Sequence, residues 1–231
     1  MNFFLISFLC AAPLTFWSAH ADCLNDAQIH LWKKDYRTAA YYLECARSKD
    51  PENVTVLSQL AIARSYQRQY VSAGAAFQLG IIAAMEKSDS LQLKDLLWNR
   101  QSLFVQLFNR GVRAERGKSV KLHGSARPTY SGLITKHWGG ADAVRDTTVF
   151  PDYDGGSPLE ESAYFFEAAS YVDPTSVEVF QKLTHQLSAL GLYEDAIRSA
   201  NFALELHPAD ALLSQELQSA RKVQKKGSTY R

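Results

Sequence analysis

The chain has no excess of either charge, because 25 lysines and arginines nearly balance 24 aspartates and glutamates among its 231 residues. A protein that binds mainly nucleic acid or an anionic membrane usually concentrates basic residues on one face or in one segment. The near-neutral balance therefore argues against both partners. Apolar and aromatic residues make up 46% of the chain, a share typical of an ordered globular protein.

Recognisable catalytic motifs are also missing. The sequence contains no H-E-x-x-H, no G-x-S-x-G and no phosphate-binding loop, and its histidines are scattered. The three cysteines, Cys10, Cys23 and Cys45, form no C-x-x-C pair. A calcium loop that began at Asp152 would have Ala163 where its bidentate glutamate belongs. These absences predict a protein that is not an enzyme and that carries no cofactor and no metal.

The first 21 residues resemble a secretory signal peptide. Residues 3–14 are almost purely apolar, and Ala19-His20-Ala21 forms a cleavage site of the A-x-A type. The apolar run ends near Trp17, short of the roughly 18 to 20 residues that span a bilayer. We therefore expect a signal peptide over residues 1–21, a periplasmic or secreted mature protein, and no stable membrane anchor after cleavage.

The most informative feature present is an internal repeat with a spacing of 34 residues. In the first pair of segments, Tyr36, Ala39, Ala40 and Leu43 reappear as Tyr70, Ala73, Gly74 and Phe77. In the second pair, Ser162, Phe166, Ala169, Asp173 and Pro174 reappear as Ala196, Ala200, Ala203, His207 and Pro208. This spacing is the length of a helix-turn-helix unit that cannot bury its apolar face alone and must stack on neighbours.

On these residues the chain resembles the tetratricopeptide repeat (TPR) family, of the secreted or periplasmic bacterial type. The last repeat matches the family pattern best, at Gly191, Tyr193, Ala196, Ala203 and Pro208. The resemblance implies an all-α fold in which antiparallel helix pairs stack into a solenoid. It also implies a scaffold whose function is to bind another molecule.

The repeat register divides the chain into segments. Repeats 1 and 2 occupy residues 22–87, and residues 88–117 form a long helix that ends as the first helix of repeat 3. Residues 118–157 are an inserted loop, since residues 117–156 hold seven of the twelve glycines. Loops of this length are uncommon in repeat arrays and are usually functional or disordered, and we expect a partly ordered loop over one face of the stack. The second helix of repeat 3 and repeat 4 follow at 158–210, and a C-terminal capping helix and tail at 211–231.

Cys23 and Cys45, which remain after cleavage, lie at equal distances from Lys34 in the expected turn of repeat 1. Two residues equidistant from the turn of an antiparallel helix pair face each other, which permits a disulfide. The alternative is that both remain buried thiols.

Binding in the TPR family usually uses the concave face, formed mainly by the first helix of each repeat. The register places on that face Gln28, Leu31, Trp32, Ser58, Ile62, Tyr66, Phe108, Val112, Arg116, Gln181 and His185. Mixed aromatic, aliphatic and polar side chains of this kind suit an extended peptide or a helix in a groove. We therefore expect a protein or peptide partner in the cell envelope, although the apolar members of this set could equally be packing residues.

Three other functions remain open at this point. The insertion could occupy the groove, which would make the protein a self-blocked or oligomerising adaptor. An enzyme or metal site could form in the insertion from His123, His137, Asp142, Asp146, Asp152 and Asp154. Aromatic side chains at Trp32, Tyr66 and Trp138 could stack on a cell-wall polysaccharide. The sequence identifies neither the partner nor the host nor the oligomeric state.

Overall fold

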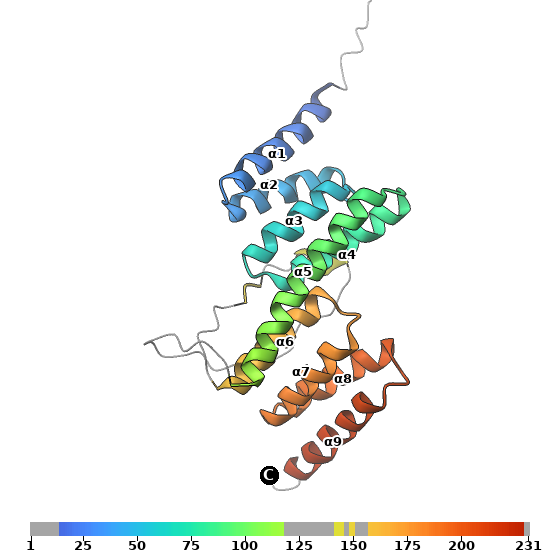
Figure 1. The fold of residues 1–231 in the computed structure, drawn as a ribbon. Coiled ribbons are helices and arrows are strands. Elements are labelled where there is room, and N and C mark those ends of the chain that lie inside the picture. Colours follow the sequence, from blue (N-terminus) through green and yellow to red (C-terminus); the bar gives the residue numbers. More distant parts are fainter. Residues whose placement is uncertain (1–13, 118–140, 146–147, 151–156, 229–231) are drawn as a thin grey trace, which may run out of the picture.

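The computed structural model describes residues 14–117, 141–145, 148–150 and 157–228. These residues form nine α-helices and one short 3-10 helix, η1, and no strand occurs among them. The elements are α1 (Leu14–Trp32), α2 (Tyr36–Lys49), α3 (Val54–Tyr66), α4 (Tyr70–Glu86), α5 (Ser90–Glu115), η1 (Ala141–Arg145), α6 (Pro158–Val172), α7 (Val177–Ala189), α8 (Tyr193–Leu206) and α9 (Ala211–Ser228). The helices form an elongated stack that runs from α1 at one end to α9 at the other (Figure 1).

Helices that follow one another in the chain pack in adjacent pairs. The pairs are α1 with α2, α3 with α4, α5 with α6, and α7 with α8, and α9 packs on α8 and α7. This arrangement confirms the predicted all-α fold of stacked antiparallel helix pairs, which is the tetratricopeptide architecture. Most of the predicted inserted loop lies outside the described residues, and so do residues 1–13 of the predicted signal peptide. The helix α1 continues without a break through Ala21.

The turn inside each complete repeat follows one hydrogen-bonding scheme. Three residues join the two helices, and the middle one has a left-handed backbone: Lys34 (φ 59°), Arg68 (φ 59°) and Gly191 (φ 78°). The N–H of the next residue then donates to the carbonyl five residues earlier, for example Asp35 to His30 at 2.9 Å. This is the Schellman ending of a helix, which satisfies carbonyls that the last turn leaves without partners.

Longer connections join most repeats, but α4 and α5 are an exception. Four residues connect α2 to α3, α6 to α7 and α8 to α9, and each of these connections contains a proline that prevents helix continuation. Only three residues join α4 to α5, and there Ser88 (φ 55°) takes the left-handed position and Asp89 N–H donates to Ala84 at 2.9 Å. The connection between α4 and α5 therefore has the turn geometry found inside the helix pairs α1–α2, α3–α4 and α7–α8.

The apolar side chains form two clusters. The N-terminal cluster joins α1–α4 to Leu96 of α5, and the C-terminal cluster joins α6–α9 to Leu107 of α5. The backbones of α4 and α6 lie in close contact at Gly74. A Cβ added there would lie only 2.0 Å from the carbonyl oxygen of Tyr171. The long helix α5 and this close contact connect the two halves of the stack.

The first helix pair also carries a covalent link. Cys23 of α1 and Cys45 of α2 form a disulfide with a Cα–Cα distance of 6.0 Å, within the usual range for such bonds. The disulfide therefore joins α1, the first described helix, to α2 at one end of the stack (Figure 1).

Two described pieces of the predicted insertion are anchored on second helices. Val144 of η1 is fully buried in the N-terminal cluster, and its carbonyl accepts a hydrogen bond from the Ser72 hydroxyl of α4. The ring of Phe150 is buried against Tyr70, Tyr164 and Tyr171. These contacts place residues 143–145 and 148–150 against α4 and α6.

Candidate binding groove between α3 and α5

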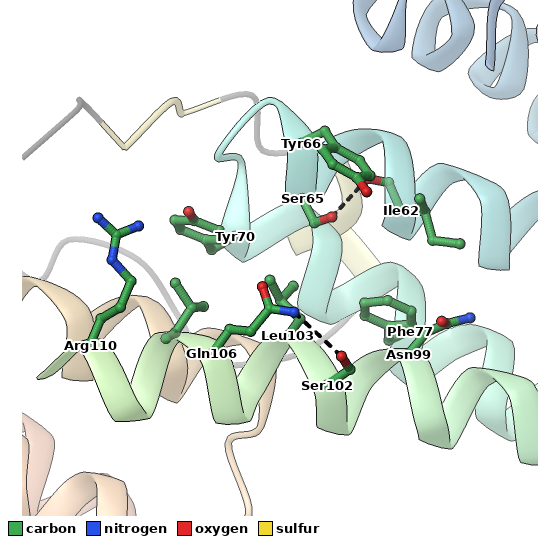
Figure 2. A pocket seen from close by; sticks show the side chains of 11 residues that line it. Ile62, Ser65, Tyr66, Tyr70, Phe77, Asn99, Ser102, Leu103, Gln106 and Arg110 are labelled. Carbon is green, nitrogen blue, oxygen red and sulfur yellow. Dashed lines mark hydrogen bonds between the residues drawn. The ribbon is translucent and has the colours of Figure 1, made fainter. Parts of the chain in front are cut away.

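A groove of about 420 Å³ lies between α3 and α5, with α4 beneath it. Its lining residues are Ile62, Ser65, Tyr66, Tyr70, Phe77, Asn99, Ser102, Leu103, Gln106, Leu107 and Arg110. Figure 2 shows the α5 side chains pointing toward α3, with Arg110 and Tyr70 at one end and Ile62 and Asn99 at the other.

Helical periodicity brings these side chains together. The α5 residues recur every three or four positions, which places them along one face of that helix. The two helices run in the same direction, and their first turns are tied by a hydrogen bond of 3.0 Å from Thr55 of α3 to Gln92 of α5. The helix α3 ends at Tyr66, whereas α5 continues to Glu115, so the groove extends past the end of α3 to Tyr70 and Arg110.

The lining combines an apolar floor with polar walls. Phe77 and Leu107 are buried and Ile62 and Leu103 are partly buried. Apart from Arg110, the polar side chains are hydroxyls and amides, and Gln106 donates to Ser102 at 3.4 Å. Tyr66 is 63% exposed, and its ring stacks on Tyr36 with centroids 4.0 Å apart. Apolar contact and hydrogen bonding are therefore both available to a ligand in the groove.

One end of the groove is electropositive. Arg110 is exposed, and its guanidinium lies over the ring of Phe165 at 4.1 Å from the centroid. Burial raises the pKa of the neighbouring Tyr70 phenol, and the positive charges of Arg110 and Arg68 oppose that rise. Burial likewise raises the pKa of Tyr164. The phenols at this end therefore stay neutral and add no negative charge beside Arg110.

The predicted concave-face residues are spread over several environments. Ile62 and Tyr66 line the groove, and Ser58 lies one turn before Ile62 on α3. On α1, at the end of the stack, Gln28 and Trp32 are exposed, Trp32 at 85%, and Leu31 is partly buried against the N-terminal cluster.

The predicted residues of α5 and α7 are engaged elsewhere. Phe108 and Val112 pack on the C-terminal cluster, and the Phe108 ring lies 5.4 Å from that of Phe166. Arg116 is exposed at the C-terminal end of α5. Gln181 donates to Asp210 at 3.0 Å, and His185 contacts Glu216 at 3.2 Å. The structure therefore brings only two of the predicted residues into the groove.

The four polar groove residues of α5, Asn99, Ser102, Gln106 and Arg110, were not predicted. On this helix the repeat register selected Phe108, Val112 and Arg116. A signal for the missed residues exists, because polar side chains recur every three or four residues through a stretch without proline.

The described lining of the groove consists of apolar, hydroxyl, amide and guanidinium groups. Its eleven described lining residues include no histidine, cysteine, aspartate, glutamate or lysine, so Ser65 and Ser102 have no general base in the lining. Within the described parts of the chain, no three histidine, cysteine or acidic side chains are grouped to hold a metal ion. The proposed metal or acid-base residues His123 and His137 lie outside the described residues, as do Trp138, Asp146, Asp152, Asp154 and the side chain of Asp142.

A second hollow, of about 410 Å³, lies on another face of α5. Its lining residues are Ser90, Leu93, Lys94, Leu97, Trp98 and Gln101, all from this one helix. Among the described residues no second element forms an opposite wall, so the groove between α3 and α5 is the stronger candidate site.

Comparisons with known proteins found no matching protein-family model and no matching curated protein. Solved structures do match. The MamA protein is 10% identical, with 89% of this chain and 82% of that chain covered and a TM-score of 0.32. TTC0263, a thermophilic TPR protein in Thermus thermophilus, is 15% identical, with 87% and 98% covered and a TM-score of 0.29. YrrB, described as a TPR protein with an unusual peptide-binding site, is 15% identical, with 87% and 96% covered and a TM-score of 0.29.

The helix pairing, the turn scheme and the 34-residue spacing define the fold of this chain. This is a helical repeat fold of the tetratricopeptide type. No helix in the described ranges is both long and apolar enough to cross a membrane.

Proposed function

We propose that this protein is a non-catalytic periplasmic or secreted scaffold that binds an extended peptide segment of a cell-envelope protein in the groove between α3 and α5. The observation that carries the proposal is the groove lining, in which apolar side chains form the floor, hydroxyls and amides form the walls, and Arg110 stands at one end. Apolar side chains of a peptide would fill the floor, and its backbone groups would bond to Asn99 and Gln106.

The length of the groove suits a short segment. Asn99 and Arg110 are eleven helical steps apart, or about 16 Å at about 1.5 Å per residue. An extended peptide rises about 3.3 Å per residue, so about five residues would span this length. Successive side chains of an extended chain point to opposite sides, so two or three of the five would face the floor.

The described parts of the insertion support an open groove. Residues 143–145 and 148–150 contact α4 and α6, and none of them lines the groove. The self-blocked adaptor thus has no supporting contact among the described residues. The signal-peptide pattern and the disulfide of Cys23 with Cys45 support an oxidising compartment outside the cytosol.

The proposal can be tested by filling the groove. A fluorescein-labelled seven-residue peptide, selected from a random library on the mature protein, would serve as the probe in fluorescence anisotropy. Gln106 is exposed on the groove face of α5, so Gln106→Trp would occupy the groove without altering the apolar clusters. We expect its affinity for the probe to fall at least tenfold.

The matched control is Gln101→Trp, which adds the same side chain to the second hollow on the same helix. It is expected to keep the probe affinity within twofold. Equal loss in both variants, or loss in Gln101→Trp alone, would place the peptide outside the groove. Circular dichroism would verify that both variants retain the helical fold.

A further inference from the structure

We propose that the face of α5 that forms the second hollow is a self-association surface. On it the α5 helices of two copies of this chain pack antiparallel about a two-fold axis that passes between Asp95 and Leu96. The partner at this surface is therefore a second copy of the chain. The inference does not rest on the proposed peptide groove, because the two hollows share no lining residue.

Large apolar side chains are exposed along this part of α5. Trp98 is 75% exposed and Leu91 is 70% exposed. Leu91, Lys94 and Trp98 follow one another at intervals of three and four residues, so they form one continuous stripe on the helix. The α5 side chains that pack on the C-terminal cluster begin only at Leu103. A continuous exposed apolar surface of this kind marks an interaction site.

The lining residues of the second hollow have the spacing of a helix–helix interface. They recur at steps of three and four positions on one face of α5, as in the seam between paired helices. These residues are Ser90, Leu93, Lys94, Leu97, Trp98 and Gln101. Because no other described element forms an opposite wall, a helix from another molecule has the shape that fits this position.

The chemistry of this face is self-complementary. In an antiparallel pair about the midpoint of Asp95 and Leu96, each lining residue lies opposite another lining residue of the second copy. The opposed pairs are Ser90 with Gln101, Leu93 with Trp98, and Lys94 with Leu97. Polar groups thus meet polar groups, apolar groups meet apolar groups, and the aliphatic stem of the lysine covers the leucine. A two-fold contact between identical subunits requires this kind of self-complementarity.

The charges beside the axis favour a second copy over an unrelated helix. Lys94 and Asp95 are both exposed, and no ion pair of either residue is found within the described chain. Since both residues adjoin the axis, Lys94 of each copy can reach Asp95 of the other. The two-fold symmetry then gives two equivalent ion pairs, and complementary charges of this kind fix the choice of partner and its register.

The resulting dimer would be weak and would present two peptide grooves. The paired stretch from Ser90 to Gln101 is about 16 Å long. Its interface is smaller than the roughly 800 Å² per partner of a stable complex, so we expect a dissociation constant of about 10 µM. The groove between α3 and α5 lies on another face of α5 and stays open in the dimer.

Sedimentation velocity of the mature, disulfide-bonded protein tests the proposal. Between about 1 and about 100 µM the protein should change from mostly monomer to mostly dimer. Trp98→Ala should raise the dissociation constant at least tenfold, because a buried tryptophan contributes strongly to an interface. The matched control is Trp32→Ala, which removes an exposed tryptophan from α1 and should change the constant less than twofold.

Charge reversal tests the symmetry of the contact. Lys94→Glu places two carboxylates together at each ion pair, and Asp95→Lys places two ammonium groups together, so each variant alone should be monomeric. An equimolar mixture of the two variants should form a heterodimer, because each reversed charge then meets its opposite in the other chain. Recovery of the dimer in the mixture would also show that neither variant is misfolded.

Three results would overturn the inference. They are a natural protein that stays monomeric at about 100 µM, a dimer that survives Trp98→Ala and both charge reversals, and a mixture of the reversed variants that stays monomeric. Binding of the peptide probe would be unchanged in each case, because a monovalent peptide reports on each groove separately. The proposed function and this inference can therefore fail independently.

Discussion

The side of the stack formed by the first helices of the repeats is open between α3 and α5 and closed between α5, α7 and α9. In the closed region Glu115 of α5 accepts hydrogen bonds from Lys182 at 2.9 Å and from Gln186 at 3.1 Å, both on α7. Gln181 and His185 of α7 contact Asp210 and Glu216, which precede and belong to α9. Side chains that face a neighbouring helix here are already bound to it.

The difference lies in the residue types that meet across each gap. Around α7, carboxylates on one side face amide, ammonium or imidazole groups on the other, so the gap is closed by direct contacts. Between α3 and α5, uncharged Ser65 faces the amides and hydroxyls of α5, and no ion pair is found among the described residues that line this gap. A polar concave residue is therefore available to a ligand only where the next helix supplies no complementary partner.

The largest loss of stability is expected from a substitution that separates the open region from the closed region at the contact between α4 and α6. In Gly74→Ala the new Cβ would lie 2.0 Å from the Tyr171 carbonyl oxygen, and a backbone atom cannot move aside as a side chain can. We expect the free energy of unfolding to fall by about 3 kcal/mol in urea denaturation.

The matched control for this change is Gly80→Ala, whose Cβ would lie 3.1 Å from the flexible Leu96 side chain. The gain in helix propensity offsets this contact, so a change below about 1 kcal/mol is expected. Equal stability of the Gly74→Ala variant and the natural protein would show that the two regions do not depend on this contact.

A slightly smaller loss of stability, confined to the region that contains α1 and α2, is expected from removing the disulfide. The 22-residue separation of Cys23 and Cys45 corresponds to about 3 kcal/mol on the loop-entropy model, less any residual structure in the unfolded chain. In Cys23→Ser/Cys45→Ser, hydrogen exchange should accelerate in α1 and α2 and stay unchanged in α7–α9. The natural protein in dithiothreitol should behave like the variant, and the variant should be insensitive to dithiothreitol. Identical melting of the natural protein with and without dithiothreitol would contradict the presence of the bond.

The smallest loss of stability is expected from removing the contact between Glu115 of α5 and Lys182 of α7 in the closed region. Glu115→Gln removes a partly exposed ion pair with Lys182, and such pairs contribute about 0.2 to 1 kcal/mol. We expect thermal unfolding to shift accordingly and the groove probe to bind within twofold of the natural protein. A tenfold change in probe affinity would show that the two regions form one binding surface, and the comparison made above would not hold.

Most of the fold could be predicted from the sequence, and the groove could be predicted only in part. The pairing of Tyr36 with Tyr70 in the register located the repeats, and Ile62 and Tyr66 follow from it. The register placed Phe108 on the concave face, and in the structure Phe108 packs on the C-terminal cluster while Gln106 lines the groove. A repeat register carries no information on how far α5 extends past α3 or which of its faces turns toward α3. The extent of the insertion, residues 118–157, stays a prediction because most of these residues lie outside the described chain.

Local physical chemistry explains what the sequence alone determined about this protein. The 34-residue period, the small residues at helix crossings and the prolines after second helices each act within a few residues or one neighbouring helix, and they specify stacked helix pairs. The tertiary structure decided which polar side chains remain free for a ligand. Glu115 and Lys182 are 67 residues apart and pair only when α5 and α7 become neighbours, whereas Arg110 meets no such partner in the described chain. Binding capacity therefore depends on what the fold leaves unpaired, and that is a property of helices far apart in the sequence.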